Sequence, residues 1–197
     1  MRLEEAKRDQ YRRLARQQGY KSRAAYKLLE NVRKYRLIKP GDVVLDFGAA
    51  PGGWLQVAAE AAGDRGLVVG VDLEPVYIDE PNVVFIQSDV RSPDLPLKLE
   101  KALPRKADVV LSDLSPEVTG TWDLDHNRQV ELTLAAAGLM DGFLRRGGNA
   151  MFKVFDGERF GEVRAALSNR FGRVQVTKPK ASRRASAELY LVCFGLL

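Results

Sequence analysis

The chain has 197 residues, which is enough for one α/β domain with a full hydrophobic core, and its 45% hydrophobic and 29% charged residues are typical of a soluble globular protein. No apolar run approaches the roughly 20 residues that span a bilayer, and the charged N-terminus lacks a signal-peptide core, so a cytoplasmic location is expected. A single cysteine excludes an intrachain disulfide, and with a single histidine beside it an ordinary structural zinc site is excluded too.

The net charge of +5 is distributed unevenly along the chain. Residues 1–40 hold 13 lysines and arginines against four acidic residues, whereas the other 157 residues carry a small excess of acid. A second basic stretch, residues 170–184, contains six lysines and arginines and no acid. This asymmetry favours a polyanionic partner such as nucleic acid, with a merely solubilising surface as the alternative.

The N-terminal 40 residues precede the main pattern of strands and helices. Residues 1–19 are polar and basic and predict either a helix or a loose arm. Residues 22–36 predict an amphipathic helix with Ser22 as its N-cap. The breaker KPGD at 39–42 follows, so we divide a single domain over 1–197 into a basic extension, 1–40, and a core, 41–197.

Beyond residue 41, apolar strand-like runs alternate with helical patterns. The predicted strands are 42–48, 66–73, 82–89, 107–113, 149–155, 173–178 and 188–195. The predicted helices are 54–63, 93–102, 126–146 and 157–171. Continuous apolar strands separated by helices predict a mostly parallel sheet covered by helices on both faces. Only ten residues join the last two strands, so we expect a hairpin and an antiparallel last strand.

The strongest local motif is DVVLDFGAAPGGW, where a strand ends at Asp46 and a loop of small residues leads into a helix. Small residues let a ligand approach the backbone, and this first strand-to-helix turn is where nucleotide-like ligands bind in open α/β sheets. The motif is neither the dinucleotide fingerprint nor a P-loop. Because no lysine accompanies the glycines, the loop favours a ligand without phosphates, and S-adenosylmethionine is such a ligand.

Aspartates close four successive predicted strands, at Asp46, Asp72, Asp89 and Asp113. An acid at Asp72 can accept hydrogen bonds from ribose hydroxyls, and Asp89 could meet an adenine amino group. Aspartate is also a common turn former, which explains one or two of these positions but not four beside a glycine-rich loop. The pattern therefore indicates a nucleoside-containing cofactor at this edge of the sheet.

These segments together resemble the FtsJ/RrmJ family of ribosomal RNA ribose 2′-O-methyltransferases, in particular its archaeal members. The resemblance covers about residues 18–195 and rests on SRAAYKLLE, GAAPGGW, SDLSP, FKVF and SRRASAELYLV, in this order. It implies a Rossmann-like, S-adenosylmethionine-dependent methyltransferase fold with a seven-stranded sheet. The implied activity is 2′-O-methylation of a ribose in RNA, with a uridine of large-subunit ribosomal RNA as the expected target.

The resemblance also implies the site residues. The family's Lys-Asp-Lys-Glu tetrad falls on Lys27, Asp113, Lys153 and Glu188. The implied cofactor contacts are Gly52, Trp54, Asp72, Asp89 and Asp113. A lysine inside an apolar strand is itself unusual, because burying an unpaired charge is costly. We interpret Lys153 as the base or as the group that orients the hydroxyl, with Lys27 and Asp113 as essential partners and Glu188 in support; a solvated helix face is the alternative for Lys27.

The charge map predicts the RNA-binding surface. Its phosphate contacts are expected at Arg12, Arg13, Arg16, Lys21, Arg23, Lys178, Lys180, Arg183 and Arg184. Few aromatic residues interleave with these, so shape recognition of a folded RNA is expected rather than base stacking along a single strand. Cys193 is expected in the core and His126 in a solvated turn, and Trp122 and Tyr77 receive no role.

Three other functions stay open at this stage. A close variant would methylate tRNA riboses. A methyltransferase of proteins or small molecules is disfavoured by the basic N-terminus, and a non-catalytic RNA-binding module is disfavoured by the fully occupied tetrad. No metal is expected, and the protein is expected to be a monomer.

Overall fold

The computed structural model describes the backbone of residues 3–183 and 186–197, and within these ranges the side chains from residue 10 onward. Its centre is a seven-stranded sheet with the strand order β3-β2-β1-β4-β5-β7-β6. The strands are β1 (Val43–Phe47), β2 (Leu67–Asp72), β3 (Val83–Gln87), β4 (Ala107–Ser112), β5 (Leu144–Phe155), β6 (Phe171–Thr177) and β7 (Glu188–Leu196). Only β7 runs antiparallel to its neighbours, β5 and β6, which confirms the predicted mostly parallel sheet with an antiparallel last strand.

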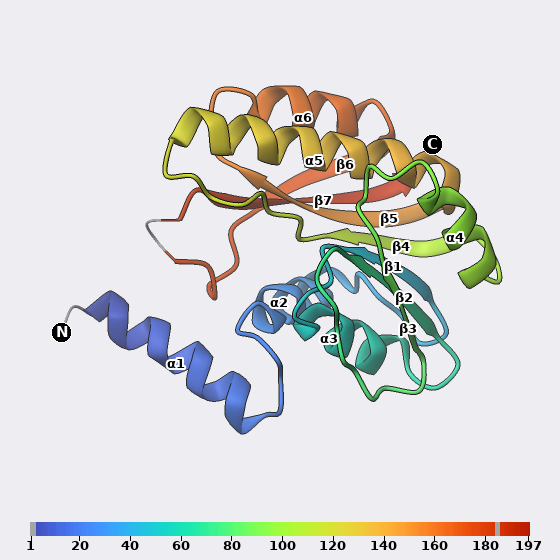
Figure 1. Cartoon of the computed structure of the whole chain (residues 1–197), viewed down its shortest axis with the longest axis horizontal. Coiled ribbons are helices and arrows are strands. Elements are labelled where there is room, and N and C mark those ends of the chain that lie inside the picture. Colours follow the sequence, from blue (N-terminus) through green and yellow to red (C-terminus); the bar gives the residue numbers. More distant parts are fainter. Residues whose placement is uncertain (1–2, 184–185) are drawn as a thin grey trace.

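Helices cover both faces of this sheet, as predicted (Figure 1). One face packs against α2 (Ala25–Tyr35) and α3 (Gly53–Ala62). The other packs against α4 (Leu95–Ala102), α5 (Trp122–Phe143) and α6 (Phe160–Ser168). Neighbouring strand residues alternate between the two cores, as Val44 and Leu45 do, because successive side chains of a strand point to opposite faces. Within the described residues, no helix is both long and apolar enough to cross a membrane.

The N-terminal segment forms two helices with different surroundings. The first, α1 (Leu3–Gln17), lies at the edge of the molecule in Figure 1, and Tyr11 meets Tyr26 of α2 at a ring-centroid distance of 5.4 Å. In contrast, α2 belongs to the core, since Ala25 and Leu28 are fully buried with α3. The buried hydrophobic face of α2 therefore fixes the position of this helix, and of its polar residues, relative to the sheet.

Three predicted boundaries are wrong. The second helix begins at Ala25 and not after Ser22, whose carbonyl instead accepts the amide hydrogen of Ala25 in a preceding turn. The helix predicted at 126–146 runs from Trp122 to Phe143, and β5 begins at Leu144 and not at Asn149. Leu144 is buried and pairs with Ala107 of β4, and the register then jumps to Asn149 opposite Val109, so the pairing is interrupted across the two glycines.

Candidate active site

A tight turn after β1 brings the ends of β1 and β4 together. Gly48 has a φ of +81°, and a Cβ atom on it would lie 2.7 Å from the backbone nitrogen of Leu114. Only glycine fits this approach without strain. The carboxylate of Asp72, at the end of β2, accepts the amide hydrogen of Ala50 at 2.8 Å and so fixes the turn to the neighbouring strand.

A cleft of about 690 Å³ opens at the carboxyl ends of these strands. Asp72, Asp89 and Asp113, three of the predicted cofactor residues, line it together with Gly48 and Ala50. The other two predicted cofactor contacts, Gly52 and Trp54, are not among the described residues that line this cleft. Gly52 is the N-cap of α3, and Trp54 is buried in the first turn of this helix, where its indole Nε1 donates to the carbonyl of Ala24 at 2.9 Å.

The fourth strand-end aspartate has a different role from the other three. Asp46 is fully buried beneath the turn, and neither carboxyl oxygen has a hydrogen-bond partner among the described residues. Burial, and after it the nearby carboxylates of Asp113 and Asp72, raises the pKa of Asp46 well above its ordinary value. Burial therefore favours the neutral form of Asp46, and the strand-end carboxylates that line the cleft are those of Asp72, Asp89 and Asp113.

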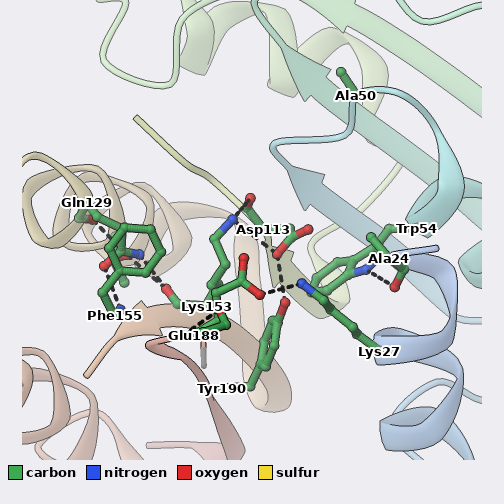
Figure 2. A network of polar contacts seen from close by, with 12 residues as sticks. Ala24, Lys27, Ala50, Trp54, Asp113, Gln129, Lys153, Phe155, Glu188 and Tyr190 are labelled. Atoms are coloured by element: carbon green, nitrogen blue, oxygen red, sulfur yellow. Dashed lines mark hydrogen bonds and ion pairs between the residues drawn. The ribbon is translucent and has the colours of Figure 1, made fainter. Parts of the chain in front are cut away.

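The four side chains of the predicted tetrad lie together beside the cleft (Figure 2). Lys27 Nζ lies 2.7 Å from Glu188 Oε2. Lys153 Nζ donates to the backbone carbonyl of Asp113 at 2.7 Å and lies 3.3 Å from the carboxylate oxygen Oδ1 of the same residue. Both lysines are buried, and each has a carboxylate partner that compensates for the loss of solvation.

Sheet register explains why residues so distant in the chain meet here. In the β5–β7 pairing, Lys153 lies opposite Tyr190 and Phe155 lies opposite Glu188. Asp113 directly follows β4, which pairs with the other side of β5. The ends of β4 and β5 and the start of β7 therefore converge, and α2 adds Lys27 from the adjacent face.

Tyr190 joins the two ion pairs and was missed by sequence reasoning. Its hydroxyl donates to Asp113 Oδ1 at 3.0 Å, while its ring centroid lies 5.8 Å from Lys27 Nζ and 5.8 Å from the ring centroid of Trp54. Burial, and after it the charges of Asp113 and Glu188, raises the pKa of Tyr190 well above its ordinary value, so it stays a hydrogen-bond donor. Its position two residues after Glu188, on the same face of one strand, was the available signal.

The electrostatics of Glu188 favour its ionised form. Its burial on its own would raise the pKa of this carboxyl, but the ammonium groups of Lys27 and then Lys153 outweigh that effect and bring the pKa below its ordinary value. Glu188 therefore carries a full negative charge at neutral pH. The site thus brings the amines of two lysines beside the carboxyl groups of Glu188 and Asp113.

The backbone around Lys153 is held by a buried amide side chain from α5. Pairing between β4 and β5 ends at Ser112 and Phe152, so the polar backbone groups beyond Phe152 need other partners. Gln129 supplies them, since its Nε2 donates to the carbonyl of Lys153 at 2.8 Å and its Oε1 accepts the amide hydrogen of Phe155 at 3.0 Å. Sequence reasoning missed Gln129 because nothing local marks a long-range backbone partner.

The expected solvated turn at His126 is wrong. The segment is the first turn of α5, which packs against the loop after β5, and the ring of His126 is only 3% exposed. Its Nε2 accepts the amide hydrogen of Arg159 at 3.0 Å, and its ring stacks on Trp122 at a centroid distance of 5.7 Å. The histidine is thus a structural residue of this corner. Cys193 is fully buried, as expected.

The two basic stretches lie against each other next to the tetrad. Arg23 Nη2 donates to the carbonyl of Ala181 at 2.7 Å, and Glu30 accepts the amide hydrogen of Lys180 at 2.8 Å. Arg23 is partly buried by this contact. The other predicted RNA contacts that the structure describes are exposed, namely Arg12, Arg13, Arg16, Lys21, Lys178, Lys180 and Arg183. Arg184 lies outside the described residues.

Comparison with known proteins connects this arrangement to a family. Residues 20–196 match the family described as FtsJ-like methyltransferase. A protein of Cenarchaeum symbiosum named ribosomal RNA large subunit methyltransferase E is 52% identical over 99% of this chain and 98% of its own length. A protein of the same name from Nitrosopumilus maritimus is 46% identical, and the alignment covers both chains completely.

Solved structures agree in fold. A crystal structure from Plasmodium falciparum, described as that of a ribosomal RNA methyltransferase, is 33% identical and superposes with a TM-score of 0.81 over 90% of this chain and 99% of its own. Fibrillarin from Aeropyrum pernix, solved with natively bound S-adenosylmethionine, is 19% identical with a TM-score of 0.59 over 86% of this chain and 73% of its own, and shows a shared fold. The site, the matched sequence and these folds together show that the chain belongs to the FtsJ-like methyltransferase family.

Proposed function

We propose that this protein transfers a methyl group from S-adenosylmethionine to the 2′-hydroxyl of a ribose in large-subunit ribosomal RNA, with a uridine as the expected nucleotide. The observation that carries the proposal is the position of the Lys153 amine, buried beside the cofactor cleft with Asp113 as its partner. Relatives at 46% and 52% identity over essentially the whole chain are named for methylation of this RNA. Family membership and site geometry therefore point to the same chemistry.

The cleft suits S-adenosylmethionine in size and in chemistry. Its volume of about 690 Å³ lies within the range of small-molecule sites. Its carboxylates suit hydroxyl, amino and sulfonium groups, and the glycine turn allows close approach to the backbone. We assign Asp72 to the ribose hydroxyls and Asp89 to the adenine end, with Asp113 as a further contact. When bound there, the cofactor supplies a methyl group already activated by its sulfonium.

The tetrad would then position the nucleophile. A lysine ammonium has three N–H donors, and the contacts of Lys153 among the described residues both go to Asp113, so the amine can also meet a ribose hydroxyl. Lys153 acts there either as the base that takes up the hydroxyl proton or as the donor that orients the oxygen. Asp113 fixes this amine, and the Lys27–Glu188 pair closes the opposite side of the site.

The pH dependence of the chemical step separates the two roles of Lys153. If the neutral amine is the base, the single-turnover rate rises with pH as the amine loses its proton. If the ammonium is the donor, the rate falls over the same change. In both cases Lys153→Arg, which keeps the charge but changes the shape, is expected to be impaired.

The two basic stretches, in residues 1–40 and 170–184, would together bind the RNA backbone. Because phosphate binding releases counterions, affinity for ribosomal RNA is expected to fall steeply between 50 and 300 mM salt. Charge removal at an exposed residue such as Arg13 should reduce the slope of this salt dependence by about one counterion. Binding that stays flat over this range would contradict the proposed footprint.

The direct test is transfer of radiolabelled methyl from S-adenosylmethionine to purified large-subunit ribosomal RNA, followed by mapping of the modified ribose. Parallel reactions with tRNA and with assembled large subunits distinguish the alternatives. Methylation of a ribose in ribosomal RNA supports the proposal, and methylation of tRNA alone would replace it with the tRNA function. Absence of transfer to every RNA would contradict both.

The remaining expectations belong to the same proposal. We place the enzyme in the cytoplasm as a monomer, with residues 1–40 contacting RNA and residues 41–197 forming the catalytic core. Sedimentation of the purified protein tests the monomer, and a second copy bound at micromolar concentration would contradict it. Removal of residues 1–19 should weaken RNA binding while leaving cofactor binding intact, since Lys27 and the core helix α2 remain.

A further inference from the structure

An exposed aromatic stack lies at the edge of the site and has no part in the mechanism above. Trp122, the first residue of α5, is 47% exposed, which is unusual for so large an apolar side chain. Its ring is nearly parallel to those of two neighbours, with an angle of 16° to His126 and 21° to Phe155. The centroid distances are 5.7 Å and 6.0 Å, respectively. We call Trp122, His126 and Phe155 the aromatic stack.

The aromatic stack borders the tetrad directly. Phe155 is two residues beyond Lys153 on β5 and lies opposite Glu188 in the sheet register. In Figure 2 the ring of Phe155 lies on the side of Lys153 away from Lys27, next to Gln129. A ribose held at the Lys153 amine would therefore have this aromatic surface on one side and the Lys27–Glu188 pair on the other.

Hydrogen bonds hold two of the three residues of the aromatic stack. Gln129 binds both the backbone carbonyl of Lys153 and the backbone amide of Phe155, so one side chain holds the backbone at both residues. His126 is held through its Nε2 by the backbone of Arg159. A Cβ on Gly157 would lie within 2.9 Å of three atoms of the histidine ring, so the loop closes tightly over it. A preorganised ring loses little conformational entropy when it binds a partner.

We propose that the exposed side of Trp122 stacks against the base of the nucleotide whose ribose is methylated. This inference rests on the proposed function, because it requires an RNA ribose at Lys153. A nucleobase is attached directly to its ribose, so a base can reach a surface that borders the ribose site. Flat aromatic rings bind bases of any identity by stacking, and RNA enzymes commonly hold unstacked bases in this way.

The chemistry of the surroundings favours a nucleic-acid occupant over a protein. The stack borders a charged site and lies on the same molecule as the two basic stretches that meet beside the tetrad. A base that stacks on Trp122 also leaves its phosphates free for those cations. Few aromatic residues lie along the basic stretches, so the RNA there is expected to be recognised by its shape. Stacking of a single base on Trp122 is consistent with this expectation.

The test compares the KM for RNA of Trp122→Ala and Trp122→Phe, using a short RNA that contains the mapped ribose. Loss of a base–aromatic stack is expected to raise KM roughly 5- to 100-fold for the alanine variant, whereas the phenylalanine variant keeps a ring and stays within about threefold of the parent. Cofactor affinity should be that of the parent in both variants, and Trp122→Phe should also keep the Tm of the parent. Leu97→Ala, which removes an exposed apolar side chain on α4, is the control and should leave KM unchanged.

A second substrate identifies the base. The same RNA is prepared with an abasic ribose at the methylated position, and parent and Trp122→Ala are compared on it. If Trp122 stacks this base, the parent loses affinity and the alanine substitution adds no further loss. An unchanged KM on intact RNA, or an equal loss from the substitution on both RNAs, would overturn the proposal.

Fluorescence gives an independent readout that does not require turnover. The chain has two tryptophans, and Trp54 is only 2% exposed, so RNA contact should quench mainly Trp122. The quenching should vanish in Trp122→Phe. Quenching that persists in this variant would contradict contact at Trp122. If the parent methylates no RNA, the proposed function fails, whereas methylation without any effect of Trp122 refutes only this inference.

Discussion

The ion pair between Lys27 and Glu188 should make a measurable contribution to stability. The atoms Nζ and Oε2 are 2.7 Å apart, and the two side chains are 10% and 26% exposed. Glu188→Gln keeps the shape but removes the charge, leaving the lysine without a counterion. Breaking a fully buried pair costs about 3–5 kcal/mol, and the partial exposure of Glu188 lowers the expected loss of unfolding free energy to about 1–3 kcal/mol. For a chain of this length that corresponds to a decrease in Tm of about 2–12 °C.

The Tm difference between the parent and Glu188→Gln should depend on pH in a defined direction. The pKa of Glu188 lies below its ordinary value in the folded protein, so its contribution to stability is complete above the ordinary glutamate pKa and is lost as the pH falls through the folded pKa. Thermal unfolding of parent and variant between pH 3 and pH 8 tests this. The Tm difference should be constant from pH 6 to pH 8 and should shrink in acid.

The matched control is another glutamate in an ion pair. Glu162 lies 2.8 Å from Arg159, but this pair is open to solvent, with side-chain exposures of 47% and 32%. Exposed pairs contribute little, so Glu162→Gln should change Tm much less than Glu188→Gln. Equal effects of the two substitutions, or a difference for Glu188→Gln that grows toward acid pH, would refute the reasoning.

Two further substitutions test the turn beneath the cleft. Gly48→Ala should lower the unfolding free energy, measured by chemical denaturation, by about 2 kcal/mol or more, because Gly48 has a positive φ and its Cβ would meet the backbone of Leu114. The control is Gly138→Ala on an open part of α5, which should raise the unfolding free energy by about 0.5–1 kcal/mol. Equal effects of the two substitutions would contradict the steric argument. Asp46→Asn should raise Tm at pH 7, because the raised pKa of Asp46 in the folded protein costs stability as the pH rises. The gain in Tm should disappear toward pH 4. A gain that does not depend on pH would count against a neutral Asp46.

Most of the fold could be predicted from the sequence, because buried parallel strands produce continuous apolar runs. The strand predicted at 107–113 is observed as Ala107–Ser112, and the antiparallel last strand follows from the short connection before it. Prediction failed where local signals conflict with packing. The two glycines at 147–148 do interrupt the pairing between β4 and β5, but β5 begins before them because Leu144 is buried and pairs with Ala107.

The site could be predicted only in part, for a similar reason. Lys153 and Asp113 are marked locally, one by a charge in an apolar strand and the other by its place at a strand end. Tyr190 and Gln129 carry no such mark, since their roles depend on which strand pairs with which and where that pairing stops. The aromatic stack is of the same kind, because Trp122 and Phe155 meet only through the packing of α5 on β5.

The central claim is that the Lys153 amine serves the chemical step and not the fold or cofactor binding. The most direct measurement is the single-turnover rate of methyl transfer to ribosomal RNA by Lys153→Met, which keeps the length of the side chain, with cofactor affinity and Tm measured on the same preparation. We predict a rate lower than that of the parent by about 10²–10⁴-fold, with cofactor affinity retained. A rate within a few-fold of the parent would contradict the account.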